Sequence, residues 1–81
     1  MYDAWFSRPV PVSTGLSGDI RNLLSADQAL DLLIHHWRDP GSQAHRSALR
    51  ACRQAVSGGV SADVAREIFV EAARAARILI E

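Results

Sequence analysis

The strongest pattern of hydrophobic and polar positions in this chain runs from Ser61 to Ile80. Apolar residues recur there every three or four positions, as on one face of an α-helix; they are Val64, Ala65, Ile68, Phe69, Ala72, Ala76 and Leu79. Charged residues fall on the opposite arc, namely Asp63, Arg66, Glu67, Glu71, Arg74 and Glu81. An amphipathic helix is stable mainly through what covers its apolar face, so we expect the upstream segments to pack against this one.

Two shorter helices are predicted before it. Ser25 and Gln28 match a capping box, and the helix that follows runs to Arg38 with an apolar stripe of Ala26, Ala29, Leu30, Leu33, Ile34 and Trp37. Residues 39–42 then turn the chain, because proline disfavours helical geometry in the residue before it. A second helix is expected from about Gln43 to Val56, with a narrow face of Ala44, Ala48, Ala51, Cys52, Ala55 and Val56. Gly58 and Gly59 end it.

The pattern of the N-terminal third predicts a β-hairpin. Residues 8–13 alternate, with Val10 and Val12 on one face, and the prolines at 9 and 11 favour a strand at a sheet edge. Residues 14–19 carry turn residues, and Ile20–Leu24 can return as the second strand. Because an isolated hairpin is marginal in water, it needs the helices beneath it. We therefore predict one α+β domain over residues 1–81, a hairpin packed on three α-helices (ββααα).

Both ends of the chain leave two interpretations open. Ile78, Leu79 and Ile80 either finish the last helix or form a short C-terminal strand beside the hairpin. Tyr2, Trp5 and Phe6 are costly to leave in water. They either fold over the helices as a lid or dock on a second copy of the chain.

Charge and cysteine content narrow the functional classes. The chain of 81 residues has nine basic residues, all arginine, and nine acidic residues, so the formal net charge is zero. A neutral total argues against nonspecific attraction to nucleic acid or to a membrane. The single cysteine cannot form an internal disulfide and fits a reducing compartment. No apolar run has the length of a signal peptide or a membrane span, so we expect a soluble, cytoplasmic protein.

Several motifs together resemble one family. They are Pro9-Val10, Ala29-Leu30 running to Trp37, Ala44-His45-Arg46 with Ala48 leading to Cys52, and the stretch from Ala65 to Ala73. This set is similar to the small bacterial proteins, mostly from rhizobia and their relatives, of domain of unknown function 982. Members of that family often have a glycine just before the terminal aliphatic residues, where this chain has Ala76-Arg77. The resemblance implies a shared fold and carries no activity, cofactor or catalytic residue.

The residue types of active and metal sites do not converge in the sequence. Cys52 and His45 are seven residues apart on one predicted helix, about 10 Å along its axis, which is beyond hydrogen-bond reach. His35 and His36 are adjacent, so their side chains leave a helix about 100° apart. We expect His35 to pair with Asp31 one turn earlier. We predict no enzyme, and we assign no catalytic, metal-binding or cofactor-binding residue.

An arginine stripe on the middle helix suggests nucleic acid as one class of partner. Arg46, Arg50 and Arg53 share a face, with no acidic residue between Gln43 and Gly58. A run of three helices with a basic stripe is compatible with DNA recognition. The neutral total charge argues against it, and a solvated face paired with acids of the last helix is the competing interpretation.

Protein–protein contact is the function that the pattern favours. Val70 lies within the charged arc of the last helix, and Leu32 lies at the polar side of the first. With Tyr2, Trp5 and Phe6 they predict an apolar patch of the kind that marks an interface. We therefore predict a non-catalytic interaction or regulatory module that self-associates, with a homodimer or a protein partner. A small nucleic-acid-binding protein is the alternative.

Overall fold

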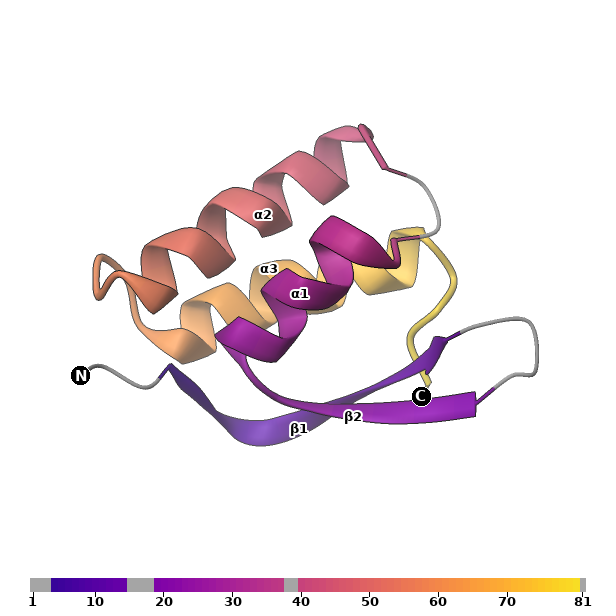
Figure 1. The fold of residues 1–81 in the computed structure, drawn as a ribbon, viewed down its shortest axis with the longest axis horizontal. Helices are drawn as coiled ribbons and strands as arrows, with labels where there is room; N and C mark the ends of the chain where they lie inside the picture. Colours follow the sequence, from indigo (N-terminus) through magenta and orange to yellow (C-terminus); the bar gives the residue numbers. More distant parts are fainter. Residues whose placement is uncertain (1–3, 15–18, 38–39, 81) are drawn as a thin grey trace.

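The computed structural model describes residues 4–14, 19–37 and 40–80. Its elements follow the order β1 (Trp5–Thr14), β2 (Asp19–Ser25), α1 (Ala26–His35), α2 (Gln43–Val56) and α3 (Ala62–Ala75). The two strands form an antiparallel hairpin that lies beneath the three helices (Figure 1). This is the predicted α+β arrangement, a hairpin followed by three helices.

The core lies between the inner face of the hairpin and the helices. Val10, Val12 and Leu23 point from the strands into it, and all three are fully buried. Phe69 of α3 is also fully buried, and its ring meets that of Trp37 edge-on at a centroid distance of 5.6 Å. Apart from Leu32, Leu33 and Cys52, alanines fill the remaining helical core positions, which lets the helices approach closely. The predicted central role of the last helix is confirmed in this packing.

The first half of β1 departs from regular pairing and is held by α3 instead. Trp5 pairs with Ser25 and Val10 with Leu23, so five steps along β1 correspond to two steps along β2. The backbone N–H of Ser7 donates to Asp63 Oδ1 at 2.8 Å. Arg66 donates from Nε to the Arg8 carbonyl at 2.9 Å and from Nη2 to the Pro9 carbonyl at 3.3 Å. These two side chains thus supply partners for backbone groups in the irregular segment.

Serine caps all three helices at their N-termini. Ser25, Ser42 and Ser61 each accept a hydrogen bond from the backbone N–H three residues later. This arrangement satisfies one free amide at each helix start. The predicted capping box is only half formed, because the Gln28 Oε1 atom accepts from the Leu24 N–H rather than from the N–H of Ser25. Gln28 therefore bonds to the strand as well as starting the helix.

The C-termini of α2 and α3 share one backbone motif built on different residues. After α2, Gly58 has a φ of 89°, and the Gly59 N–H reaches back to the Gln54 carbonyl at 2.6 Å. After α3, Arg77 takes the same left-handed region with a φ of 61°, and the Ile78 N–H reaches the Ala73 carbonyl at 3.0 Å. This Schellman pattern favours glycine, so an arginine there carries backbone strain.

The residues after α3 lie along β1. Leu79 forms an isolated antiparallel bridge with Val12. The Ser13 N–H donates to the Ile78 carbonyl at 2.7 Å, and the Ile80 N–H donates to the Pro11 carbonyl at 3.0 Å. Residues 78–80 therefore lie outside α3, which ends at Ala75, and the helical interpretation is excluded for them. Their contact with the hairpin is a bridge rather than a third strand.

Two buried faces differ from those expected. In α1, Leu32 is 1% exposed and Ile34 is 51% exposed, the reverse of their predicted orientations. The helix is rotated about its axis because it packs against β2 and α2 together. Four aliphatic residues within five positions, namely Leu30, Leu32, Leu33 and Ile34, allow more than one apolar face. In α3, Val64 is exposed, whereas Ala73 is fully buried.

Candidate protein–protein interaction surface

The face of the hairpin that points away from the helices carries exposed aliphatic side chains. Residues alternate across a strand, so burial of Leu23 turns Ile20, Asn22 and Leu24 outward. Ile20 is 62% exposed and Leu24 is 42% exposed. Pro11 pairs with Asn22 on this face, and Ile80, 38% exposed, follows next to Pro11. We call Pro11, Ile20, Asn22, Leu24 and Ile80 the outer sheet face.

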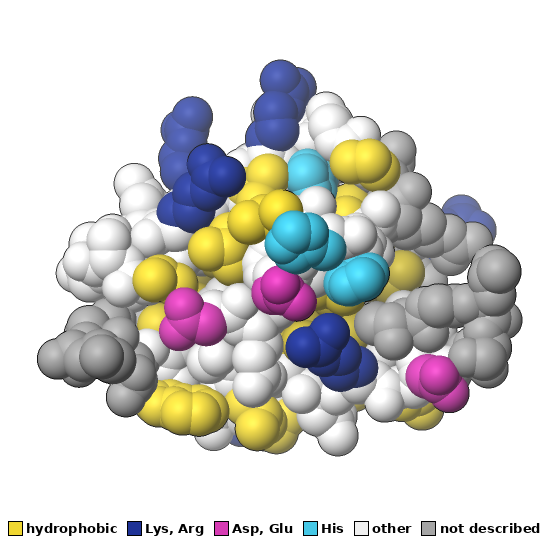
Figure 2. Space-filling view, viewed as in Figure 1, with side chains coloured by type: hydrophobic (Ala, Val, Ile, Leu, Met, Phe, Trp, Pro, Cys, Tyr) yellow, Lys and Arg dark blue, Asp and Glu magenta, His cyan; other side chains and the backbone are white. Residues whose placement is uncertain are grey.

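This surface is visible at the edge of the molecule. Hydrophobic side chains gather along the lower border, over β1 and β2 (Figure 2). Exposed aliphatic residues are normal when they are single. Here, however, the aliphatic members of the outer sheet face lie on the same side of three adjoining segments, with Ile20 and Leu24 on β2, Pro11 on β1 and Ile80 beyond it. Aliphatic side chains that share one face in this way are expected of a contact surface.

One edge of the hairpin is covered and the other is open. On β1, Ser13 donates to Ile78 and Pro11 accepts from Ile80, so the backbone groups of these two residues face the C-terminal segment. Val10 and Val12 must then face β2. By the same alternation, the N–H and C=O groups of Ile20 and Asn22 point away from β1. Within the described part of the chain no segment pairs with this outer side of β2.

The predicted interface residues are not brought together. Phe6 is 9% exposed and Leu32 is 1% exposed, so both side chains are covered within the chain itself and neither is exposed as the predicted apolar patch requires. Phe6 packs in the core and Leu32 faces it because of the rotation of α1. Trp5 remains 59% exposed. Tyr2 lies outside the described residues.

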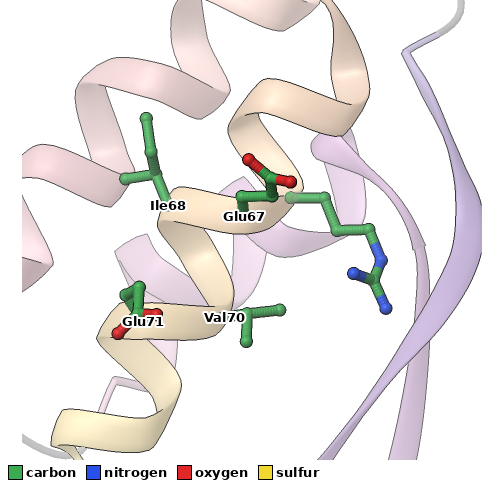
Figure 3. A pocket seen from close by; sticks show the side chains of 5 residues that line it. Glu67, Ile68, Val70 and Glu71 are labelled. Atoms are coloured by element: carbon green, nitrogen blue, oxygen red, sulfur yellow. The ribbon is translucent and has the colours of Figure 1, made fainter.

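Val70, the remaining predicted interface residue, is half-buried beside a surface depression on α3. The depression has a volume of about 390 Å³ and is lined by Arg66, Glu67, Ile68, Val70 and Glu71. Figure 3 shows Ile68 and Val70 leaving the helix in different directions, with Glu67 and Glu71 on the turns beside them. The surface mixes charged and aliphatic groups, and it belongs to one helix only.

The arginine stripe is exposed as predicted, but its expected partners do not contact it. Arg46, Arg50 and Arg53 are all exposed on α2. Within residues 4–14, 19–37 and 40–80, no acid of α3 forms an ion pair with them. Arg46 and Arg50 line a shallow depression with Gln43 and Ser47. Figure 2 shows basic side chains projecting from the α2 border of the molecule.

His45 and Cys52 are buried and contribute to packing between the helices. The Nε2 atom of His45 lies 2.8 Å from the Leu33 carbonyl, and its Nδ1 accepts from the Gly41 N–H at 3.3 Å. These contacts tie the start of α2 to α1 and match a neutral ring protonated on Nε2. Burial raises the pKa of the Cys52 thiol to about 12, so the reactive thiolate is disfavoured. The ring of His45 is engaged by backbone groups, not by Cys52.

Other polar groups give no metal site in the residues that the structure describes. His35 lies 3.8 Å from Asp31, which is the predicted pair. No group of three His, Cys, Asp or Glu side chains comes together in the described ranges. Among the described helices, none combines the length and apolar character needed to cross a membrane.

The exposed residues Ile20 and Leu24 were not identified from the sequence. The available signal was the strand itself, in which Ile20 and Leu24 alternate with Arg21 and Leu23. Both faces of such a strand contain a leucine, so the pattern alone does not decide which face is buried. Only the neighbouring helices settle the orientation.

Comparison with known proteins places this geometry in a family. A family model described as "Protein of unknown function (DUF982)" matches residues 8–80. The NMR structure of the Agrobacterium tumefaciens protein Atu1219 is similar, with a TM-score of 0.80 and 37% sequence identity. That similarity covers 96% of this chain and 77% of the other. No match was found among curated proteins.

The chain belongs to the DUF982 family. This confirms the resemblance seen in its motifs, including the link to proteins of the rhizobial group through the Agrobacterium structure.

Proposed function

We propose that this member of the DUF982 family is a non-catalytic protein–protein interaction module whose first partner is a second copy of itself. The observation that carries the proposal is the outer sheet face, where Ile20, Leu24 and Ile80 are exposed on adjoining segments. Burying such aliphatic surface releases roughly 25 cal/mol per Å². Covering this face therefore supplies a driving force for association.

The test measures self-association by sedimentation over a concentration series. It compares a variant of the outer sheet face with a control variant elsewhere on the surface. We expect the unmodified chain to shift towards a dimer as its concentration rises. The double variant Ile20→Lys/Leu24→Lys is expected to remain monomeric. Ile34→Lys changes an equally exposed aliphatic on α1 and is expected to leave association unchanged. A strict monomer at millimolar concentration would contradict the proposal.

A second candidate function is nucleic-acid binding through Arg46, Arg50 and Arg53. It is supported by the exposure of all three guanidinium groups and by the lack of ion-pair partners for them in the described part of the chain. Free arginine side chains suit phosphate oxygens because their planar donors form two parallel hydrogen bonds.

Retention on a DNA column at low salt tests this candidate. Charge reversal at Arg46, Arg50 and Arg53 is expected to abolish any retention. Arg53→Glu and Arg21→Glu change the net charge equally, one inside and one outside the stripe, and only Arg53→Glu is expected to reduce retention. Equal retention of the unmodified chain and the triple variant would exclude the arginine stripe as a nucleic-acid contact.

A further inference from the structure

We infer that two copies associate by pairing β2 with β2 of the second copy, antiparallel and centred on Ile20. This inference rests on the proposed self-association and adds the edge, the direction and the register of the contact. The result is a continuous four-stranded sheet across a two-fold axis. The outer sheet faces of both copies then lie side by side.

The available backbone groups select the turn end of β2. Strand addition requires N–H and C=O groups that point away from the existing partner strand. On β2 these belong to Ile20, Asn22 and Leu24, but the Leu24 N–H already donates to Gln28 Oε1 at 2.8 Å. Pairing that extends to Leu24 would break this bond. The free groups are therefore those of Ile20 and Asn22, and a pairing centred on Ile20 joins the N–H and C=O groups of Ile20 in the two copies.

Charge complementarity then fixes the register. When Ile20 lies opposite Ile20 of the second copy, Asp19 of each chain faces Arg21 of the other. These positions form non-hydrogen-bonded pairs, in which cross-strand side chains are closest. Moving the two-fold axis by one residue, which slips one strand by two residues against the other, would instead place Arg21 against Arg21 of the second copy. Like charges directly opposite are unfavourable. Asp19 and Arg21 are both exposed on the strand.

The opposite edge of the hairpin is not equivalent. On β1 the C-terminal residues already bond to Ser13 and Pro11, and both prolines lack an N–H. A second chain would have to displace Ile78–Ile80 before it could pair there. The open edge of β2 needs no such displacement.

The first experiment reverses the charges and measures dimer dissociation by sedimentation. Asp19→Arg and Arg21→Asp are each expected to weaken association about tenfold or more, because each creates two like-charged pairs across the axis. The double variant Asp19→Arg/Arg21→Asp restores opposite charges and is expected to recover most of the affinity. The double variant has the net charge of the unmodified chain, so an effect of net charge is tested separately with Arg53→Asp. That variant makes the same change in charge as Arg21→Asp at an exposed position on α2 and is expected to leave association unchanged.

The second experiment uses disulfide trapping in a Cys52→Ala background. Ile20→Cys places two thiols on residues whose Cα atoms are about 5.5 Å apart in a hydrogen-bonded pair, within disulfide range. Mild oxidation should therefore give a covalent dimer. Asn22→Cys is the matched control, because its two copies would lie more than about 10 Å apart along the strands. It should not cross-link at the same rate.

The outcomes distinguish this inference from the proposed function. A dimer that survives both single reversals, or that cross-links equally through position 22, overturns the pairing centred on Ile20 and leaves self-association standing. A monomer at every concentration overturns both. Selective trapping at position 20 with recovery in the double reversal supports both.

Discussion

The two strands of the hairpin differ in whether the backbone groups at their outer edges are hydrogen-bonded to other segments. β1 is bonded along both sides: β2 pairs on one side, and on the other the C-terminal residues contact Ser13 and Pro11. Its irregular half is held by Asp63 and Arg66 of α3. Among the residues that the structure describes, β2 pairs with β1 on one side, and on the other side Gln28 accepts a hydrogen bond from the Leu24 N–H.

This difference indicates where the molecule can accept a partner. Unpaired strand edges are sites of association, and proteins that avoid it cover them or break them with proline. Both devices are found on β1. The open part of β2 has neither, and it lies beside the exposed aliphatic residues Ile20 and Leu24.

The largest expected effect is a difference in the free energy of unfolding between substitutions on the two faces of β2. Leu23 is fully buried and Leu24 is 42% exposed. Leu23→Ala should lower the free energy of unfolding by about 2–4 kcal/mol, because it removes core contacts and leaves a cavity. Leu24→Ala should cost less than about 1 kcal/mol while weakening association. Urea denaturation checks the first effect and sedimentation the second; equal destabilisation by the two changes would contradict the assignment of faces.

The covered edge of β1 is tested by removing one donor. Ile80→Pro eliminates the N–H that bonds to the Pro11 carbonyl and should cost about 1–2 kcal/mol of stability. Ile80→Ala keeps the N–H and is the matched control. Thermal unfolding of the two variants measures the difference. If both lose the same stability, the backbone bond contributes nothing and only the side chain matters.

Arg66 clamps the irregular half of β1 to α3 through its hydrogen bonds to two strand carbonyls. Removing this clamp should lower the stability of the fold somewhat less. Arg66→Ala eliminates both hydrogen bonds to the carbonyls of Arg8 and Pro9. We expect a loss of about 1 kcal/mol, since these bonds are partly exposed to water. Arg50→Ala removes an unpaired arginine from α2 and should leave stability unchanged. Similar melting temperatures for the two variants would argue against the clamp.

Relief of backbone strain at the end of α3 should raise stability. Arg77 has a φ of 61°, a region that costs a residue with a side chain roughly 1–2 kcal/mol. Part of this gain is offset by the greater chain entropy of glycine in the unfolded state. Arg77→Gly should therefore stabilise by about 0.5–1 kcal/mol in urea denaturation. Gly58→Ala, at the matching position after α2, should destabilise by a similar amount.

The smallest effect is a pH dependence. The backbone N–H of Ser7 lowers the pKa of Asp63 from its ordinary value of 3.8. A carboxyl whose folded pKa is depressed stabilises the fold above the unfolded pKa, and this contribution disappears as pH falls through the folded pKa. The slope of stability against pH below about 3.8 should therefore be shallower in Asp63→Asn. An unchanged slope would mean that Asp63 is not responsible.

Sequence reasoning located the elements well because their ends carry strong local signals. Ser42, Gly58 and Ser61 bound α2 and the start of α3 as expected. The hairpin was found from the valines at 10 and 12 and from the turn residues that follow. These features depend on short-range geometry, so they can be read without knowing the tertiary packing.

The orientation of each element was harder to predict. Leu32 was expected to be exposed and is buried, and Ile34 was expected to be buried and is exposed. The apolar arc of α1 is wide, and packing against β2 and α2 determines which part of it is buried. The same applies to Ile20 and Leu24, which lie on a strand with apolar residues on both faces. The contacts made by Asp63 and Arg66 join segments more than fifty positions apart, and no local pattern signals them.

The bridge between Val12 and Leu79 limits how far an assembly built by the proposed pairing of β2 with β2 can grow. A chain with two open strand edges can add copies at both and extend into a fibre. Here the C-terminal residues cap one edge, so each molecule has a valence of one. In the proposed pairing, association through the other edge closes after a single step, which gives a finite pair rather than a polymer.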